Sequence, residues 1–96
     1  MNITERLSAL SAEIAEERTQ LAILEEQVAF QSEVADDARI RALVSETPLA
    51  DRESRIATED LQRMIRSRDD ARRRLDELRA EQDALLERMS EATHER

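Results

Sequence analysis

The stretch SETPLADRE, residues 45–53, decides how this chain folds. It holds Pro48, the only proline among the 96 residues. Thr47 is a good N-cap, and proline is well tolerated at the first helical position, where its missing N–H has no intrahelical acceptor. Asp51 and Glu53 would then lie in the first turn, where carboxylates favour the positive end of the helix dipole. We therefore predict that one helix ends and a second begins at this point.

The segment before this stretch has the apolar spacing of one long helix. It opens with MNITE, in which Asn2 is the predicted N-cap and Glu5 its capping-box partner. From Ile3 to Val28, apolar residues recur at alternating intervals of three and four, interrupted once by Glu17, and the seam continues in alanines: Ile3, Leu7, Leu10, Ile14, Leu21, Leu24, Val28, Ala35, Ala38 and Ala42. This heptad seam predicts a helix over about 3–45. The alternative is a break near Asp36–Asp37, which would make 37–46 a separate short helix.

The segment after the proline carries a second seam of the same spacing. Its positions include Arg68 and Gln82 and are otherwise apolar: Leu61, Met64, Ala71, Leu75, Leu78, Leu85, Met89 and Ala92. We predict a second helix over about 48–92, with a turn at about 46–48. A connection this short favours antiparallel neighbours. The predicted fold is therefore all-α: one domain, residues 1–96, forming a long antiparallel two-helix hairpin, a coiled coil.

The composition supports helices and restricts the possible sites. The chain has no glycine, no cysteine and one aromatic residue, and 40% of its residues are charged. This profile is typical of long helices, because the turns of a sheet need residues such as Gly and Asn. Without cysteine there is no disulfide and no thiolate metal site, which fits a cytoplasmic location. No apolar run reaches the length of a membrane span, so we expect no membrane partner.

The charge distribution favours the hairpin and disfavours nucleic acid as a partner. The formal net charge is −8, which opposes binding to phosphates. Residues 61–79 hold seven Arg against four acidic residues, whereas 16–34 hold five Glu and one Arg. Folding back at 47–48 would place these two segments side by side. Each exposed ion pair contributes about 0.2–1 kcal/mol, so the pattern favours a register more than it adds stability.

Phe30, the only aromatic residue, lies off the predicted seam. At about 100° per residue, Ile23, Phe30 and Val34 share a narrow arc on nearly the opposite side of the first helix, with Val44 as a weaker member. A helix with two apolar faces is normally covered on both, and one hairpin covers only one. We predict that two copies pack through this face into a homodimeric four-helix bundle. The alternatives are a surface for a different protein, or exposed residues without a role.

A second candidate surface is acidic. Five carboxylates are predicted to lie at or near the bend: Asp36, Asp37, Glu46, Asp51 and Glu53. In general shape, a helical hairpin with an acidic tip resembles the coiled-coil hairpins of Gre-type and DksA-type transcription factors. That resemblance implies insertion of the tip into the secondary channel of RNA polymerase. Those families add a globular or zinc-bearing domain, which these 96 residues do not hold.

Nothing in the sequence indicates catalysis. His94 is the only histidine, so a zinc site would lack ligands. Carboxylate pairs such as Asp69–Asp70 need a desolvating pocket for acid–base chemistry, and a hairpin offers none. We expect no catalytic residue, no cofactor and no metal. The predicted function is a non-catalytic protein–protein interaction module, a coiled-coil adaptor or scaffold that self-associates. The alternative is a transcription regulator that presents the acidic tip to RNA polymerase.

Overall fold

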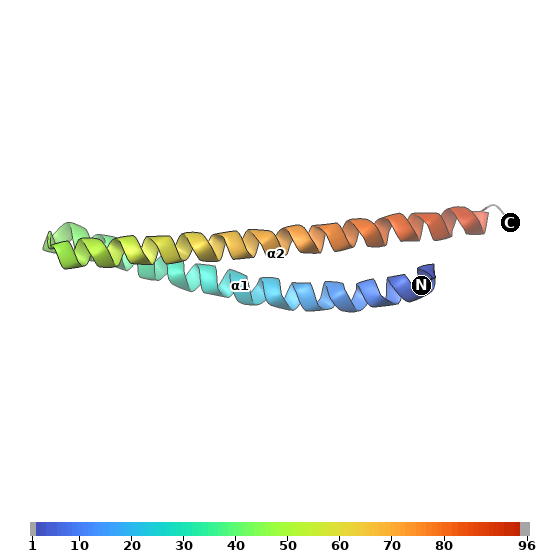
Figure 1. Ribbon diagram of the computed structural model, residues 1–96, viewed down its shortest axis with the longest axis horizontal. Coiled ribbons are helices and arrows are strands. Elements are labelled where there is room, and N and C mark those ends of the chain that lie inside the picture. Colours follow the sequence, from blue (N-terminus) through green and yellow to red (C-terminus); the bar gives the residue numbers. More distant parts are fainter. Residues whose placement is uncertain (1, 95–96) are drawn as a thin grey trace. The chain divides into compact units, whose positions relative to one another are not determined.

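The computed structural model describes residues 2–94, and over that range it contains two α-helices and no strand. Helix α1 spans Ile3–Ser45 and α2 spans Pro48–His94, joined by a two-residue turn (Figure 1). The fold is all-α, an antiparallel two-helix hairpin, as the sequence predicts. α1 has the predicted bounds, and α2 ends two residues beyond the predicted end at 92. The alternative break near Asp36–Asp37 is wrong, because α1 is continuous through both residues.

Both helices begin at the residues that the sequence indicates. Asn2 Oδ1 accepts a hydrogen bond from the Glu5 backbone N–H at 2.8 Å, and Asn2 Nδ2 donates to Glu5 Oε1 at 3.4 Å. At the second start, Thr47 Oγ1 accepts a hydrogen bond from the Ala50 N–H at 3.2 Å, and Pro48 is the first helical residue. The two predicted N-caps are therefore confirmed, and each satisfies an N–H that a helix leaves without an intrahelical acceptor.

The turn depends on one residue in an unusual backbone conformation. Glu46 has φ of 50°, in the left-handed region, and its N–H donates to the Ala42 carbonyl at 3.1 Å. A residue with a Cβ pays about 1 kcal/mol or more to adopt this conformation, which glycine adopts freely. Since the chain has no glycine, a side-chain-bearing residue must end α1. Thr47 then starts α2 at once, so the reversal needs only two residues.

Contacts divide the chain into two units, which are described separately below. The terminal unit comprises residues 2–21, which hold the first part of α1, and residues 71–94 of α2, and the turn unit comprises residues 22–70. In Figure 1 the terminal unit is coloured blue and orange to red, and the turn unit runs from light blue through green to yellow. Each unit contains one stretch of both helices, so each has its own part of the seam.

In the terminal unit, the seam is filled mainly by large aliphatic side chains. Leu10 is completely buried, and Ile14 and Leu75 are buried with it, together with the smaller Ala71. Further seam residues are half-buried: Ile3, Leu7, Leu78, Gln82 and Leu85. These are positions at which the sequence predicts the seam, so the heptad pattern identified the core of this unit.

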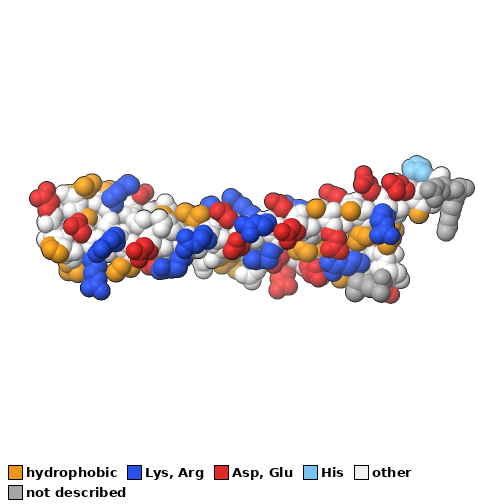
Figure 2. Space-filling model, turned by 45° about the horizontal axis from the view of Figure 1, so that its top comes forward, with side chains coloured by type: hydrophobic (Ala, Val, Ile, Leu, Met, Phe, Trp, Pro, Cys, Tyr) orange, Lys and Arg blue, Asp and Glu red, His pale blue; other side chains and the backbone are white. Residues whose placement is uncertain are grey.

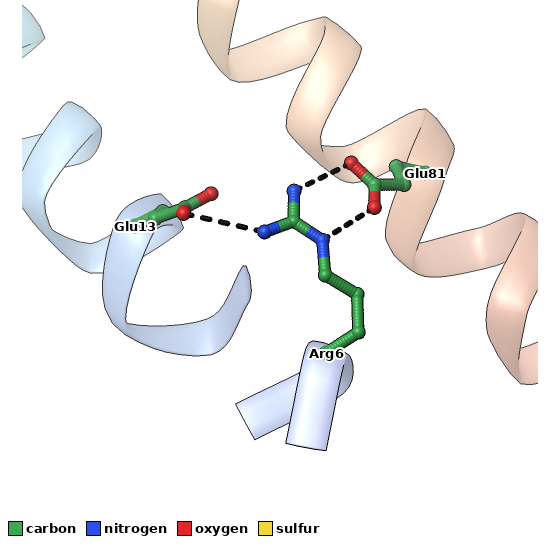
Figure 3. Close-up of polar contacts among 3 residues, drawn as sticks. All are labelled: Arg6, Glu13 and Glu81. Atoms are coloured by element: carbon green, nitrogen blue, oxygen red, sulfur yellow. Dashed lines mark hydrogen bonds and ion pairs between the residues drawn. The ribbon is translucent and has the colours of Figure 1, made fainter. Parts of the chain in front are cut away.

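Ion pairs also join the two helices of the terminal unit. Arg6 donates from Nε to Glu81 Oε2 at 2.6 Å and from Nη2 to Glu81 Oε1 at 2.8 Å, and its Nη1 lies 3.4 Å from Glu13 Oε1 (Figure 3). The hydrogen bonds from Arg6 hold the pKa of Glu81 below its ordinary value of 4.5, against a smaller opposing effect of desolvation. Arg74 reaches Glu17 at 3.3 Å, which is a contact between the basic and acidic segments that the sequence predicts.

In the turn unit, by contrast, the seam is filled by alanine. Ala35, Ala38 and Ala57 form the buried cluster, and Val34 and Leu61 pack against it while remaining half-buried. Further half-buried seam residues are Leu24, Val28, Ala42, Ala50, Ser54 and Met64. Short side chains at the seam allow close approach of the two helices. The buried cluster of this unit therefore consists of small side chains, each of which contributes little apolar area.

A side chain of α1 bonds to the backbone of α2 within this alanine seam. Gln31 Nε2 donates a hydrogen bond to the Ala57 carbonyl oxygen at 3.1 Å, although the two residues are 26 positions apart in the chain. Such contact between a side chain and the facing backbone is possible because Ala57 presents only a methyl group. Gln31 therefore links the two helices at a defined level of the turn unit.

Candidate interaction surface

The turn unit exposes most of its large apolar side chains. Phe30 is 67% exposed and Val44 is 79% exposed, although both lie within helix α1. The large hydrophobic residues exposed in this unit are Ile23, Phe30, Ile40, Leu43, Val44, Leu49 and Ile56, whereas the terminal unit exposes Leu86 and Met89. Figure 2 shows such side chains at the surface among arginines and carboxylates, including at the end that holds the turn.

Part of this exposed apolar surface forms a shallow groove along one side of the turn unit. One hollow is lined by Ile23, Phe30 and Met64, with Gln31 at its edge. The adjoining hollow is lined by Val34, Ile56 and the seam alanines, and it shares Gln31 with the first. We call the apolar lining of both hollows the groove face: Ile23, Phe30, Val34, Ile56 and Met64.

The groove face brings together three of the four interface residues that the sequence singles out. Ile23, Phe30 and Val34 line it, whereas Val44 lines neither hollow. Val34 is half-buried and packs on the alanine cluster, so it contributes to the hairpin's own core as well as to the groove. Phe30 shares no such contact with that cluster and presents most of its ring to solvent.

The contribution of α2 to this surface was missed at the sequence level. The heptad spacing places Met64 in the seam, and it gives no role to Ile56. The available signal was the spacing of Leu49 and Ile56, two off-seam apolar residues seven positions apart on α2. That spacing indicates a second apolar stripe, but it does not show that Ile56 lies level with Val34 of α1.

Charged residues without partners in the hairpin lie beside the groove face. Glu26 lines the hollow that contains Phe30, and Arg41 and Glu53 line the hollow that contains Val34. Within residues 2–94, these three side chains make no hydrogen bond or ion pair. Asp60, also in the second hollow, pairs with Arg63 on its own helix. The groove is therefore an apolar strip flanked by charges of both signs.

The five carboxylates predicted for the acidic tip are all exposed, but they do not gather at the turn. Asp36 and Asp37 lie at least eight residues before Ser45, which is more than two helical turns from the end of α1. Asp36 lies 3.3 Å from Arg39, which offsets its charge. Across residues 2–94, no three acidic or histidine side chains are grouped so that they could hold a metal ion.

The remaining three tip carboxylates lie closer to the turn. Glu46 is in the turn itself and Asp51 is in the first turn of α2. The prediction that Glu53 also lies in that first turn is wrong, because Glu53 is the sixth residue of α2 and lines the groove. The side chains around the turn are otherwise notable for apolar exposure: Leu43, Val44 and Leu49. The tip of the hairpin is therefore of mixed apolar and acidic character.

No protein-family model, no curated protein and no solved structure matches the chain. Neither helix, over the part of the chain described, has a stretch long and apolar enough to cross a membrane. The groove face and its flanking charges are accordingly the strongest candidate for a functional site.

Proposed function

We propose that this chain is a non-catalytic protein–protein interaction module, a coiled-coil adaptor or scaffold that self-associates through the groove face. The observation that carries this proposal is that the small side chains of the turn unit lie in its seam and many of its large apolar side chains lie outside the seam. Alanines occupy its seam, while Phe30 and Ile56 lie outside it with large exposed fractions. In a hairpin that acts alone, larger side chains at the seam would bury more apolar area.

The energetics of burial support an assembled form. Full burial of a large apolar side chain contributes about 1.5–3 kcal/mol, and Phe30 and Ile56 obtain only part of that within one chain. Small domains with thin cores commonly depend on oligomerisation for the missing stability. Packing two groove faces together would bury both copies of each residue at once. Self-association therefore supplies the cover that a single turn unit lacks.

Sedimentation equilibrium at micromolar concentrations tests this proposal. We expect a mass of twice the 11.1 kDa chain for the wild type. Phe30→Glu should shift the mass to that of one chain, because dimerisation would then bury two carboxylates without partners. Leu86→Glu is the matched control, since Leu86 is exposed in the terminal unit and should leave the mass unchanged. A wild-type mass of 11.1 kDa throughout the concentration range would overturn the proposal.

The transcription-regulator alternative stays a prediction and gains no specific support, because the tip is partly apolar and Asp36 and Asp37 lie away from it. Its test is co-purification with RNA polymerase that is lost on charge reversal at Asp36 and Asp37. A cytoplasmic location is part of our proposal and is supported by the cysteine-free composition alone.

A further inference from the structure

We propose that two copies of the turn unit pack groove face to groove face with both turns at the same end, so that α1 of each copy lies on α2 of the other. This inference rests on the proposed self-association and adds its geometry. The occupant of the groove is thus a second copy of this chain. The rival geometry has the turns at opposite ends, which places α1 on α1 and α2 on α2.

The geometry follows from which residues share a level of the hairpin. Phe30 and Met64 line one hollow, and Val34 and Ile56 line the next, so each pair lies at one level on the two helices. A two-fold axis parallel to the helices places α1 of one copy opposite α2 of the other. Residues at the same distance from the turn in the two copies then lie opposite each other. Phe30 of one copy then faces Met64 of the other. One level along, Val34 faces Ile56.

The flanking charges agree with the same axis. Arg41 and Glu53 line the hollow that contains Val34, one on each helix, yet they form no ion pair with each other inside the chain. With the turns at the same end, Arg41 of each copy faces Glu53 of the other. Two arginines and two carboxylates then alternate around the axis, and all four charges gain partners.

The apolar residues nearest the turn extend this match. Val44 precedes the turn by two residues and Leu49 follows it by two, and both are largely exposed. Exchange of α1 for α2 places Val44 of one copy opposite Leu49 of the other. Val44 thereby joins the interface without lining the groove of a single chain.

The opposite-end arrangement lacks this agreement. With its axis at the shared level of Val34 and Ile56, it sets Arg41 opposite Gln27 of the other copy and Glu53 opposite Glu59, because positions equally far before and after the axis meet. Arg41 then gains no charged partner, and Glu53 faces a like charge, which is unfavourable. The same-end arrangement avoids both contacts.

A charge-swap experiment between two chains tests the inference. Arg41→Glu alone creates two Glu–Glu contacts per dimer, and Glu53→Arg alone creates two Arg–Arg contacts. We expect each variant to raise the dimer dissociation constant about tenfold. An equimolar mixture of the two variants should form a heterodimer whose dissociation constant lies within about threefold of the wild-type value, because residue 41 of each chain then meets an opposite charge at 53 of the other.

The outcomes separate this inference from the function on which it rests. Both substituted residues are exposed, so circular dichroism should show unchanged helicity in each variant. A wild-type monomer would overturn the proposed function itself. A wild-type dimer whose two variants fail to rescue each other on mixing would leave self-association intact and overturn the same-end arrangement. A contact between residues 41 and 53 of the same chain could not restore dimer formation on mixing, because neither chain carries both substitutions.

Discussion

The terminal unit and the turn unit share one heptad spacing but fill it with side chains of different size. Leu10, Ile14 and Leu75 are buried in the terminal unit, whereas the buried cluster of the turn unit is made of alanines. The comparison teaches that spacing and size carry separate information. Spacing determines that the two helices pair, and size determines how much free energy the pairing supplies and which apolar groups remain for other contacts.

The two units accordingly differ in what holds their helices together. In the terminal unit, burial of leucine and isoleucine side chains contributes about 1.5–3 kcal/mol each. In the turn unit, the short connection through Glu46 and Thr47 and the Gln31–Ala57 hydrogen bond keep the helices together across a thin seam. Large apolar side chains are thus buried between the helices in the terminal unit, whereas many of those in the turn unit are exposed.

The largest expected effect comes from truncating the core of the terminal unit. Leu10→Ala should lower the free energy of unfolding by about 3 kcal/mol, because Leu10 is fully buried and the change leaves a cavity. Leu43→Ala is the matched control in the turn unit, with Leu43 72% exposed, and should change stability by less than about 0.5 kcal/mol. Urea unfolding measures both. Equal losses would mean that the two units do not differ in the way their exposures indicate.

The next effect tests whether the turn unit needs small side chains in its seam. Ala38→Leu should lower the free energy of unfolding by about 1–3 kcal/mol, since the added carbons must push the paired helices apart. Ala29→Leu adds the same atoms at an exposed position of the same helix and should change stability little. Urea unfolding of the pair gives the comparison. A gain of stability in Ala38→Leu would show unfilled space at the seam.

A smaller effect is expected at the turn. Glu46→Gly should raise the free energy of unfolding by about 0.5–1 kcal/mol, because glycine adopts a φ of 50° without a Cβ penalty. Glu46→Ala removes the same charge but keeps the Cβ, so the difference between the two variants isolates the backbone cost. Thermal unfolding of both variants at one protein concentration measures that difference. Equal stabilities would place no strain at Glu46.

The smallest effect concerns the exposed ion pair of the terminal unit. Because Arg6 depresses the pKa of Glu81 in the folded chain, the contribution of Glu81 is present above its ordinary pKa of 4.5 and is lost as the pH falls through the lower folded value. The difference in urea midpoint between the wild type and Glu81→Gln should therefore shrink as the pH is lowered from 6 toward 3. A difference that stays constant over this range would rule out the linkage.

The sequence predicted the fold from signals that are local in the chain. The caps at Asn2 and Thr47, the proline between the seams and the 3–4 spacing each act over a few residues, and they placed both helix starts correctly. The end of α2 was predicted two residues early, because the seam ends before the helix does.

The candidate interaction surface was predicted only in part, because its residues come together only through the way in which the two helices meet. Phe30 and Ile23 are identifiable from α1 alone, whereas Ile56 and Met64 join them only when the level of α2 against α1 is known. For the acidic residues, closeness to the turn in the sequence overestimates their closeness to it in space. Asp36 and Asp37 are near the turn in residue number, but a rise of about 1.5 Å per residue separates them from it along the helix.

The turn unit's alanine seam also has a consequence for the order in which the hairpin forms. The Gln31–Ala57 contact closes a loop of 26 residues, whereas the Arg6–Glu81 contact closes one of 75. Loop closure becomes less favourable by about 0.6 kcal/mol per doubling of length, so the distal contact carries an entropic cost about 1 kcal/mol larger. The weakly stabilising alanine contacts therefore lie in the turn unit, where loop closure costs least. The larger aliphatic side chains lie in the terminal unit, where loop closure costs most. We expect the two helices to pair first in the turn unit and last in the terminal unit. The alanine contacts of the turn unit would then set the folding rate, and the leucine contacts of the terminal unit would set the unfolding rate.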